Sequence, residues 1–281
     1  MSASVLPFHL PDLAFGSTML FMKRPGVLLI DLDGTLYFRG EMIPGAQKSI
    51  DELRRQGYVL RFLSNTDSKS VPSIVRNMAS MGLSMPESEI FSPATALKLF
   101  ARQHSDKTYH LLLSTDLVND LQKSGITSQD EADYVVVGDV RECADYEMLD
   151  RAFRIIMSGA NIIAMQEGRY SVAPDGYHID TGAFVKLLEY ASSKEAILLG
   201  KPSKEFFELA LHSCTCTAGD AAVVGDDIST DVAGARAIGS LAVLVKTGKA
   251  AGTSVAPGGN GPDIIIGSVA ELPATLLELE P

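Results

Sequence analysis

Short apolar runs alternate with longer amphipathic segments along almost the whole chain, and this alternation restricts its fold more than any other feature. The apolar runs predict buried strands, and the segments between them have the periodicity of helices. Strands that alternate with helices form a mostly parallel sheet covered by helices on both faces. The sequence therefore predicts an α/β fold with a doubly wound, Rossmann-like core sheet. The candidate strands are 27–31, 58–63, 110–114, 134–137, 162–165, 196–199, 221–225 and 241–245, and the candidate helices include 45–56, 68–81, 146–158, 183–192, 204–213 and 230–238.

Polar side chains follow four of these candidate strands. In doubly wound sheets, ligands bind beyond the carboxyl ends of the strands, so residues at these ends are candidates for a site. They are Asp31 and Asp33 in DLDGT, Ser64, Asn65 and Thr66 in SNT, Lys201 in GKPS, and Asp226, Asp227 and Asp231 in GDDISTD.

The candidate strands between residues 110 and 165 are followed by no comparable polar cluster. This difference predicts a core in two pieces with an inserted α/β unit between them. We expect the first piece of the core at 1–92, the inserted unit at 93–180 and the second piece at 181–281. Residues 1–25 are expected to be a loosely ordered leader, because they contain prolines and lack the pattern of a signal peptide or a membrane span. A cytoplasmic location is the default expectation.

The net charge of −11 restricts the partners of the chain. A nucleic-acid partner is not expected, because binding to phosphate backbones requires a basic face. An anionic substrate would be repelled by the overall field, so local cations would have to attract it. The three cysteines form no zinc pattern and are expected to be reduced thiols.

The acidic residues at the strand ends suit a hard cation. Asp31, Asp226 and the carbonyl or carboxylate of Asp33 would supply three oxygens, which are the ligands that Mg²⁺ prefers. A cation also makes two neighbouring carboxylates tolerable at the end of a buried strand.

The same residues suit phosphoryl transfer. A carboxylate can attack phosphorus, and a second carboxyl two residues further on can protonate the leaving oxygen. Lys201, the Ser64 hydroxyl and the main-chain N–H groups of Asn65 and Thr66 would hold the phosphoryl oxygens.

Other interpretations stay open at this point. A single D-x-D is usually a solvated turn, Ser-Asn-Thr is often a helix cap, and Lys201 alone could be an exposed lysine. A signalling receiver also combines an acidic pocket, Mg²⁺, a hydroxyl and a lysine, and it accepts a phosphoryl group without being an enzyme. A binding protein that has lost turnover is a further alternative.

These four motifs, taken together, resemble those of the haloacid dehalogenase superfamily of phosphohydrolases, in members that carry a large α/β cap of the second type. The resemblance extends from about Gly26 to Leu279. It implies an enzyme with Asp31 as the nucleophile and Asp33 as the general acid and base. It also implies Mg²⁺ on Asp31, the main chain of Asp33, and Asp226, with phosphoryl binding by Ser64 and Lys201. Asp227 and Asp231 would support these groups, and Asp231 would orient Lys201 or a metal-bound water.

The segments GKPSKEFFELAL and VVGDDISTDVAGARAIG are most similar to the branch that contains NagD-like phosphatases and the phospholysine phosphohistidine inorganic pyrophosphate phosphatases. Small phosphorylated metabolites are therefore the expected substrates, with inorganic pyrophosphate or phospholysine as the alternative. Some phospholysine-type relatives carry serine where this chain has Asp33, and an aspartate favours ester leaving groups that need a proton. Arg169 in EGRY is a candidate for contact with a second anionic group of the substrate, and a homodimer through the cap is a further hypothesis.

Overall fold

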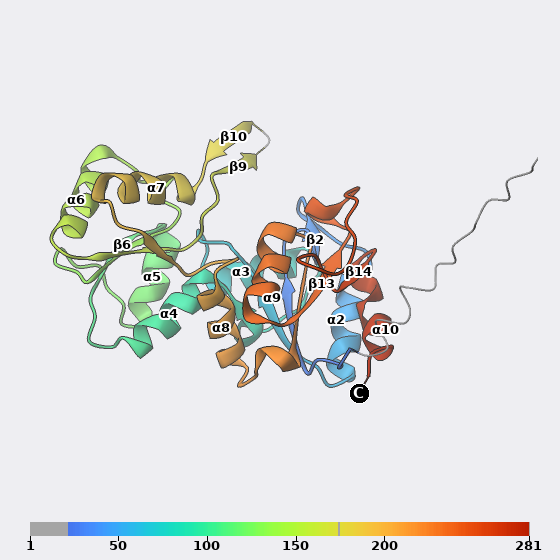
Figure 1. Cartoon of the computed structure of the whole chain (residues 1–281). Coiled ribbons are helices and arrows are strands. Elements are labelled where there is room, and N and C mark those ends of the chain that lie inside the picture. The colour runs from blue at the N-terminus through green and yellow to red at the C-terminus, as the bar shows by residue number, and fades with distance from the viewer. Residues whose placement is uncertain (1–21, 174, 281) are drawn as a thin grey trace, which may run out of the picture.

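Two parallel sheets organise the protein. The structure, a computed structural model, describes residues 22–173 and 175–280, and Figure 1 shows the two sheets in separate lobes. The larger sheet has six strands in the order β14-β13-β12-β1-β4-β5, and all of its neighbouring strands are parallel. Its strands are β1 (Val27–Asp31), β4 (Val59–Leu63), β5 (Ile90–Phe91), β12 (Ala221–Gly225), β13 (Leu241–Val245) and β14 (Ile264–Ile266).

Helices cover both faces of the larger sheet, which is why its strands read as continuous apolar runs. All five residues of β1 are buried. Leu29 packs into one apolar cluster, and its neighbours Leu28 and Ile30 pack into a second cluster on the opposite face. The prediction of a doubly wound core sheet is therefore confirmed. One face is covered by α2 (Ala46–Arg55), α3 (Val71–Ser80) and α10 (Leu272–Leu277), and the other by α4 (Pro93–Gln103), α8 (Lys204–Ser213) and α9 (Ala233–Ile238).

The smaller sheet forms the second lobe and has the order β11-β8-β7-β6, again with parallel neighbours. Together with the helices that pack on it, this sheet makes up the unit that we call the cap. The inserted α/β unit predicted from the sequence is thus present. Its elements are β6 (Tyr109–Leu112), α5 (Thr115–Lys123), β7 (Tyr134–Val137), α6 (Tyr146–Met157), β8 (Asn161–Ala164), α7 (Thr181–Ser192) and β11 (Ala196–Leu198).

The strand expected at 196–199 belongs to the smaller sheet. β11 pairs in parallel with β8, through Ala196 opposite Ile162 and Leu198 opposite Ala164. The prediction that this strand lies in the core sheet is therefore wrong. A short apolar run carries no signal for the sheet that it joins, and both sides of β1 are already occupied by β12 and β4. α7 packs on the same sheet. β11 and α7 therefore belong to the smaller sheet, although both were expected in the second piece of the core. The division into domains at 92 and 181 stays a prediction.

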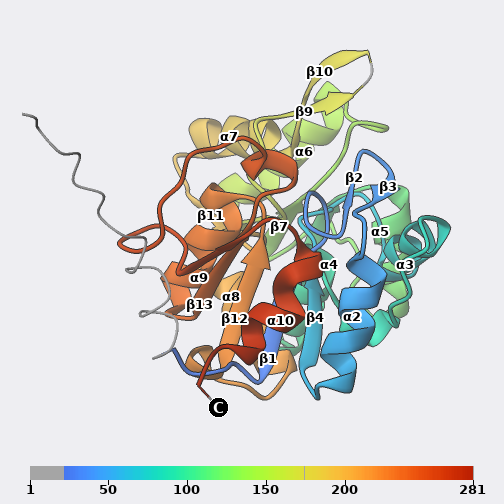
Figure 2. The same ribbon diagram turned by 90° about the vertical axis from the view of Figure 1, so that its right-hand side faces the viewer.

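Two antiparallel hairpins project from the sheets. The first consists of β2 (Tyr37–Phe38) and β3 (Glu41–Met42) and follows directly on the predicted site loop at Asp31–Thr35. The second consists of β9 (Tyr170–Ala173) and β10 (Gly176–Ile179), and Figure 2 shows it at the top of the molecule, above the first. Single-turn helices complete the described fold: η1 (Glu87–Glu89), η2 (Ala218–Asp220), η3 (Ile228–Val232), η4 (Gly248–Ala250) and η5 (Val269–Glu271).

Most of the expected leader lies outside the described residues. The described chain begins beside its own end, where Lys23 forms a β-bridge with Glu280 and the Arg24 guanidinium donates to the carbonyl oxygens of Leu276 and Leu277, each at 3.0 Å. Across residues 22–173 and 175–280, none of the helices has both the length and the apolar character that a membrane crossing requires.

A buried carboxyl group joins the larger sheet to the cap. Asp67 follows the SNT segment after β4, and its Oδ2 accepts a hydrogen bond of 2.5 Å from the Thr181 hydroxyl at the start of α7. The two residues are 5% and 1% exposed. Burial raises the pKa of Asp67 to about 7; the bond from Thr181 opposes this shift, and the negative charges of Asp180 and Asp139 add to it. The joint between the two lobes therefore contains an acid that ionises near neutral pH.

We expect Asp67→Asn to remove a pH dependence of stability. The folded protein keeps the Asp67 proton up to about pH 7, whereas the unfolded chain releases it near the ordinary value of 3.8. Between these values the folded state binds more protons, so the free energy of unfolding falls as pH rises. An amide does not ionise, so the free energy of unfolding of the variant should rise relative to that of the wild type between pH 5 and pH 8, by on the order of a few kcal/mol.

Denaturant unfolding at several pH values measures this difference. Asp106→Asn is the matched control, because the Asp106 side chain is 76% exposed and should show little change. A difference between Asp67→Asn and the wild type that stays constant with pH would contradict the assignment.

Candidate active site

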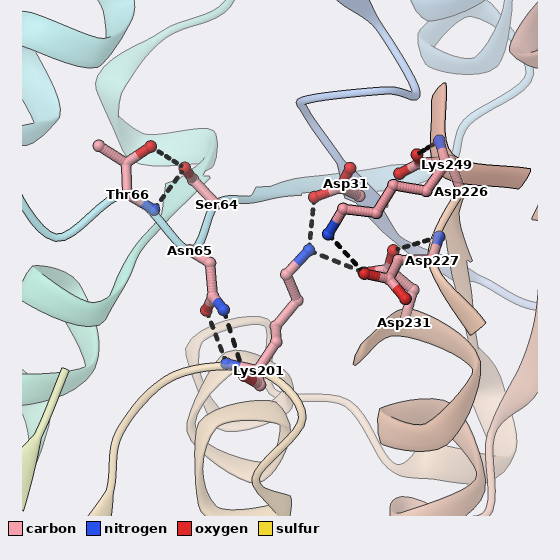
Figure 3. A network of polar contacts seen from close by, with 9 residues as sticks. All are labelled: Asp31, Ser64, Asn65, Thr66, Lys201, Asp226, Asp227, Asp231 and Lys249. Carbon is pink, nitrogen blue, oxygen red and sulfur yellow. Dashed lines mark hydrogen bonds and ion pairs between the residues drawn. The ribbon is translucent and has the colours of Figure 1, made fainter. Parts of the chain in front are cut away.

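The predicted site residues come together at one edge of the larger sheet. β1 lies between β12 and β4, so the carboxyl ends of these three strands are adjacent. Asp31 ends β1, Ser64 follows β4, and Asp226 follows β12. Lys201 reaches the same place from the segment between β11 and α8. Figure 3 shows these residues and their neighbours facing one another.

Lys201 lies between two buried carboxylates. Its Nζ donates to Asp231 Oδ1 at 2.7 Å and also pairs with Asp31 Oδ1 (Figure 3). All three residues are at most 5% exposed. Burial favours the neutral form of the lysine, but the charges of Asp231 and Asp31 outweigh it and raise the pKa of Lys201 above its usual range. Lys201 is therefore a permanent cation in this site.

The side chain of Asn65 holds the main chain of Lys201. Its Oδ1 accepts from Lys201 N at 2.8 Å, and its Nδ2 donates to Lys201 O at 3.2 Å. Gly200 permits this close approach, because a Cβ there would lie 3.0 Å from Asn65 Oδ1 and 2.3 Å from the Met165 carbonyl oxygen. The sequence predicted only a main-chain contribution of Asn65 to phosphate binding. Its side-chain role was missed, since nothing in SNT indicates a partner 136 residues away.

The Ser64 and Thr66 side chains lie together beside Asn65. The Ser64 hydroxyl donates to Thr66 Oγ1 at 2.9 Å and accepts from Thr66 N at 3.1 Å. Ser64 is buried, and Thr66 is half-buried. The predicted phosphate-binding hydroxyl is thus located at the sheet edge, held by its own loop.

Three carboxylates form a compact oxygen cluster. Asp31, Asp226 and Asp231 each offer one oxygen, and these oxygens all lie within 4.8 Å of one another. Burial raises the pKa of Asp226 to about 6, opposed by a hydrogen bond from the main chain of Lys249. Burial also raises the pKa of Asp231 to about 6, opposed by the charge of Lys201. An all-oxygen donor set of this kind fits a hard divalent cation such as Mg²⁺.

The backbone geometry at Gly34 explains why the DLDGT motif has a glycine at this position. Its φ of +88° lies in the left-handed region, and a Cβ there would come within 2.2 Å of Asp226 Oδ2. Only glycine therefore lets the loop after β1 approach the loop after β12 this closely.

Asp33 differs from the other carboxylates because it is exposed. Removal from bulk water by the surrounding loops still raises its pKa, and the positive charges of Lys249 and Lys201 oppose this shift. Of the two carboxyl groups in DLDGT, one is therefore buried and ion-paired, and the other is open to solvent. The two environments suit different chemical tasks.

Lys249 is a site residue that the sequence analysis missed. Its Nζ donates to Asp227 Oδ2 at 2.6 Å, and its main-chain N–H donates to Asp226 Oδ2 at 2.6 Å. Asp227 also accepts from the main chain and hydroxyl of Ser229, at 2.8 and 2.6 Å, at the start of η3. Burial disfavours the charge of Asp227, but the bonds from Lys249 and Ser229 prevail and lower its pKa. The available signal was a fifth polar cluster, KTGK, after the candidate strand at 241–245.

The charges at this edge of the sheet are unbalanced among the described residues. Among residues 22–173 and 175–280, the cations that contact or face these carboxyl groups are the ammonium groups of Lys201 and Lys249; the carboxyl groups are those of Asp31, Asp33, Asp226, Asp227 and Asp231. An anionic substrate would meet an excess of negative charge there. A bound divalent cation would remove most of this excess.

Two family models match the chain. One, described as haloacid dehalogenase-like hydrolase, matches residues 28–127, and another, described as HAD-hydrolase-like, matches residues 198–272. These segments contain the four loops that form the candidate site.

Two of the similar solved structures show the same fold over nearly their whole length. A p-nitrophenyl phosphatase from Archaeoglobus fulgidus is 28% identical, with a TM-score of 0.80 over 89% of this chain and 98% of that protein. NagD from Escherichia coli K-12 is 26% identical, with a TM-score of 0.78 over 89% of this chain and 98% of NagD.

Relatives among curated sequences are more similar still. Phospholysine phosphohistidine inorganic pyrophosphate phosphatase of Danio rerio is 32% identical over 244 residues, which are 84% of this chain and 88% of that protein. Haloacid dehalogenase-like hydrolase domain-containing protein 2 of Homo sapiens is 36% identical over 222 residues, which are 79% of this chain and 84% of that protein. With this identity over most of both chains, and with the family models on the site loops, the protein belongs to the haloacid dehalogenase-like hydrolases.

Proposed function

We propose that this hydrolase is a Mg²⁺-dependent phosphatase that cleaves small phosphorylated metabolites through an aspartyl-phosphate intermediate. The observation that carries the proposal is the buried arrangement of Asp31, Lys201 and Asp231 beside Asp226. It combines a carboxylate nucleophile, a permanent cation and an oxygen cluster in one place. Asp31, the main chain of Asp33, and Asp226 would hold the Mg²⁺, with Asp231 close to them. When bound, the ion supplies positive charge to the phosphoryl oxygens.

Asp31 is the proposed nucleophile. Its ion pair with Lys201 favours the carboxylate form that attack requires, against the burial that raises its pKa. A carboxylate oxygen attacks phosphorus, and the bond between phosphorus and the ester oxygen breaks. Lys201, Ser64 and the main-chain N–H groups beside it are proposed to hold the phosphoryl oxygens during this transfer.

Asp33 is the proposed general acid and base. Its raised pKa favours the protonated form, which can donate to the leaving ester oxygen. The same carboxylate then accepts a proton from the water that attacks the aspartyl-phosphate. Phosphate leaves and Asp31 is restored. The exposure of Asp33 supports this role, because both the leaving group and water can reach it.

Inorganic pyrophosphate or phospholysine is the second candidate substrate class. The printed name of the Danio rerio relative supports it. Asp33 favours esters, since their leaving oxygen needs a proton. Phosphate release from a panel that contains sugar phosphates, an aryl phosphate, pyrophosphate and phospholysine separates the two candidates. Membership in a hydrolase family makes a non-catalytic receiver or binding protein the weaker alternative.

The cap is proposed to select the substrate. Arg169 is exposed just before β9, and its carbonyl oxygen accepts from Asp180 N at 3.2 Å. Its contact with an anionic group of the substrate stays a hypothesis. A homodimer through the cap is supported by exposed apolar side chains there, such as Tyr190 at 91% and Tyr146 at 83%. A cytoplasmic location stays a prediction.

Chelation of divalent cations tests the proposed metal dependence. EDTA should abolish the hydrolysis of a simple aryl phosphate, and added Mg²⁺ should restore it, because the carboxylates outnumber the ammonium groups in the site. Phosphate release measured before and after the addition of Mg²⁺ gives the result. Full activity in the chelator would contradict the metal assignment.

Replacement of the two DLDGT carboxylates should have unequal effects. Asp31→Asn should eliminate turnover, because an amide cannot act as the anionic nucleophile. Asp33→Asn should slow turnover by about 10²–10⁴-fold, the usual contribution of general acid–base catalysis. The loss for Asp33→Asn should be smaller for esters with good leaving groups, which need little protonation. Equal losses across a series of leaving groups would assign Asp33 a structural role.

Asn65→Ala should lower activity without unfolding the protein. The variant loses both hydrogen bonds to the Lys201 main chain, so the segment that carries the ammonium is no longer fixed beside the loop after β4. A misplacement of this kind can reduce kcat/KM by on the order of 100-fold. Asn119→Ala, on the exposed side of α5, is the matched control. If both variants keep wild-type kcat/KM, the Asn65 side chain has no part in placing Lys201.

A further inference from the structure

A short turn after β13 lies across two of the site loops. The Thr247 hydroxyl donates to the Gly34 carbonyl oxygen at 2.5 Å, which ties the turn to the loop after β1. Two residues later, Lys249 donates to Asp226 and Asp227, which ties it to the loop after β12. The turn thus connects the two loops that carry most of the carboxylates.

Gly248 shows how closely this turn packs on the site. Its φ is +49°, and a Cβ there would come within 2.1 Å of Asp226 Oδ2 and 2.5 Å of Gly34 Cα. The space admits no side chain. The main chain of Lys249 is therefore held at a defined distance from Asp226.

The ammonium group of Lys249 occupies a different position from that of Lys201. The Lys201 side chain is 4% exposed and already contacts two carboxylates. The Lys249 side chain is 74% exposed, while the Asp227 carboxylate that it contacts is 12% exposed. Of the two cations described at this edge of the sheet, Lys249 is the one that solvent and solutes reach.

The contact with Asp227 matters for an incoming phosphate ester. Without Lys249, the Asp227 carboxylate would keep only its hydrogen bonds from Ser229 and would carry an unpaired negative charge with little water around it, which would repel a dianion. The same ammonium interacts electrostatically with the carboxylate of Asp33. Burial raises the pKa of Asp33, and Lys249 is the main group that opposes this rise.

We propose that Lys249 is a positioning residue for phosphate binding. Its ammonium neutralises Asp227 so that a phosphoryl dianion can enter, and its main-chain N–H orients Asp226. This inference rests on the proposed phosphatase function. It assigns to the turn at 247–249 a role that none of the four family motifs supplies.

The test compares Lys249→Met with Lys249→Arg and with a matched control. Methionine keeps an unbranched stem and the main-chain N–H but removes the charge. Lys186→Met is the control, because the Lys186 side chain is 66% exposed and pairs at 2.6 Å with Glu189, which is 14% exposed. The readouts are the Kd for inorganic phosphate in the presence of Mg²⁺, the Kd for Mg²⁺ alone, and KM and kcat for an aryl phosphate.

Lys249→Met should raise the Kd for phosphate and the KM by about tenfold, while kcat falls less. The Kd for Mg²⁺ should stay the same or decrease, because a repelling charge has been removed. Lys249→Arg should stay near the wild type. Asp227→Asn added to Lys249→Met should recover most of the phosphate affinity, because the charge that Lys249 neutralises is then absent.

Three results would overturn the inference: a Lys249→Met variant that behaves like Lys186→Met, a failure of Asp227→Asn to recover phosphate binding, or a weakened Mg²⁺ affinity. If Lys249→Met does not fold, Lys249→Gln is measured in its place against the same criteria. A wild-type protein that hydrolyses no phosphate ester with Mg²⁺ present would instead reject the proposed function itself.

Discussion

The buried contact of Lys201 with Asp31 and Asp231 is the interaction on which the rest of the site depends. A lysine and two carboxylates out of water are costly unless each charge has a partner, and removal of one partner would leave the others uncompensated. The order of the strands in the larger sheet brings these charged partners together. β12 and β1 are neighbours, so Asp31 and the loop that carries Asp231 end at the same place. Lys201 comes from a distant segment and is fixed there by Asn65, from the loop after β4.

The site loops and the turn at 247–249 approach one another closely around Asp226 and Asp231. Gly34 and Gly248 both pack against Asp226, and a Cβ on either would collide with its carboxylate. Gly225 makes the same kind of approach to Asp231, with a Cβ that would lie 2.2 Å from Oδ2. Such close packing places carboxylates at distances where their mutual repulsion is large, and burial raises the pKa of Asp226 and Asp231 to about 6. The loops therefore concentrate negative charge and leave the matching positive charge to two lysines and to whatever the site binds.

The sequence was informative where a signal is local. β1, β12 and β13 have the bounds predicted for them, because an apolar run flanked by polar residues identifies a strand covered on both faces. The strand-end motifs were recognised for the same reason, and a parallel sheet brings such ends together without further information. The sequence was uninformative for features that depend on contacts between residues far apart along the chain. The sheet joined by β11, the contact of Asn65 with Lys201, and the approach of Lys249 to Asp227 are all of this kind. Each depends on how distant segments of the chain are placed relative to one another in the folded protein, and no single segment indicates this.

The loop after β4 links the candidate site to the cap. Asn65 contacts the main chain of Lys201, and two residues later Asp67 accepts a hydrogen bond from Thr181 at the start of α7. The next residues continue the connection, since Ser114 in the cap donates to the Ser68 carbonyl oxygen at 2.8 Å and Asp116 accepts from Ser70 N at 2.8 Å. A shift of α7 relative to the larger sheet would therefore act on the segment that positions Lys201. Asp67 is buried, and burial raises its pKa to about 7, so the charge at this joint depends on pH near neutrality. The joint between the lobes and the chemistry at the sheet edge are thus connected through one short loop, whose residues contact Lys201 at one end and the cap at the other.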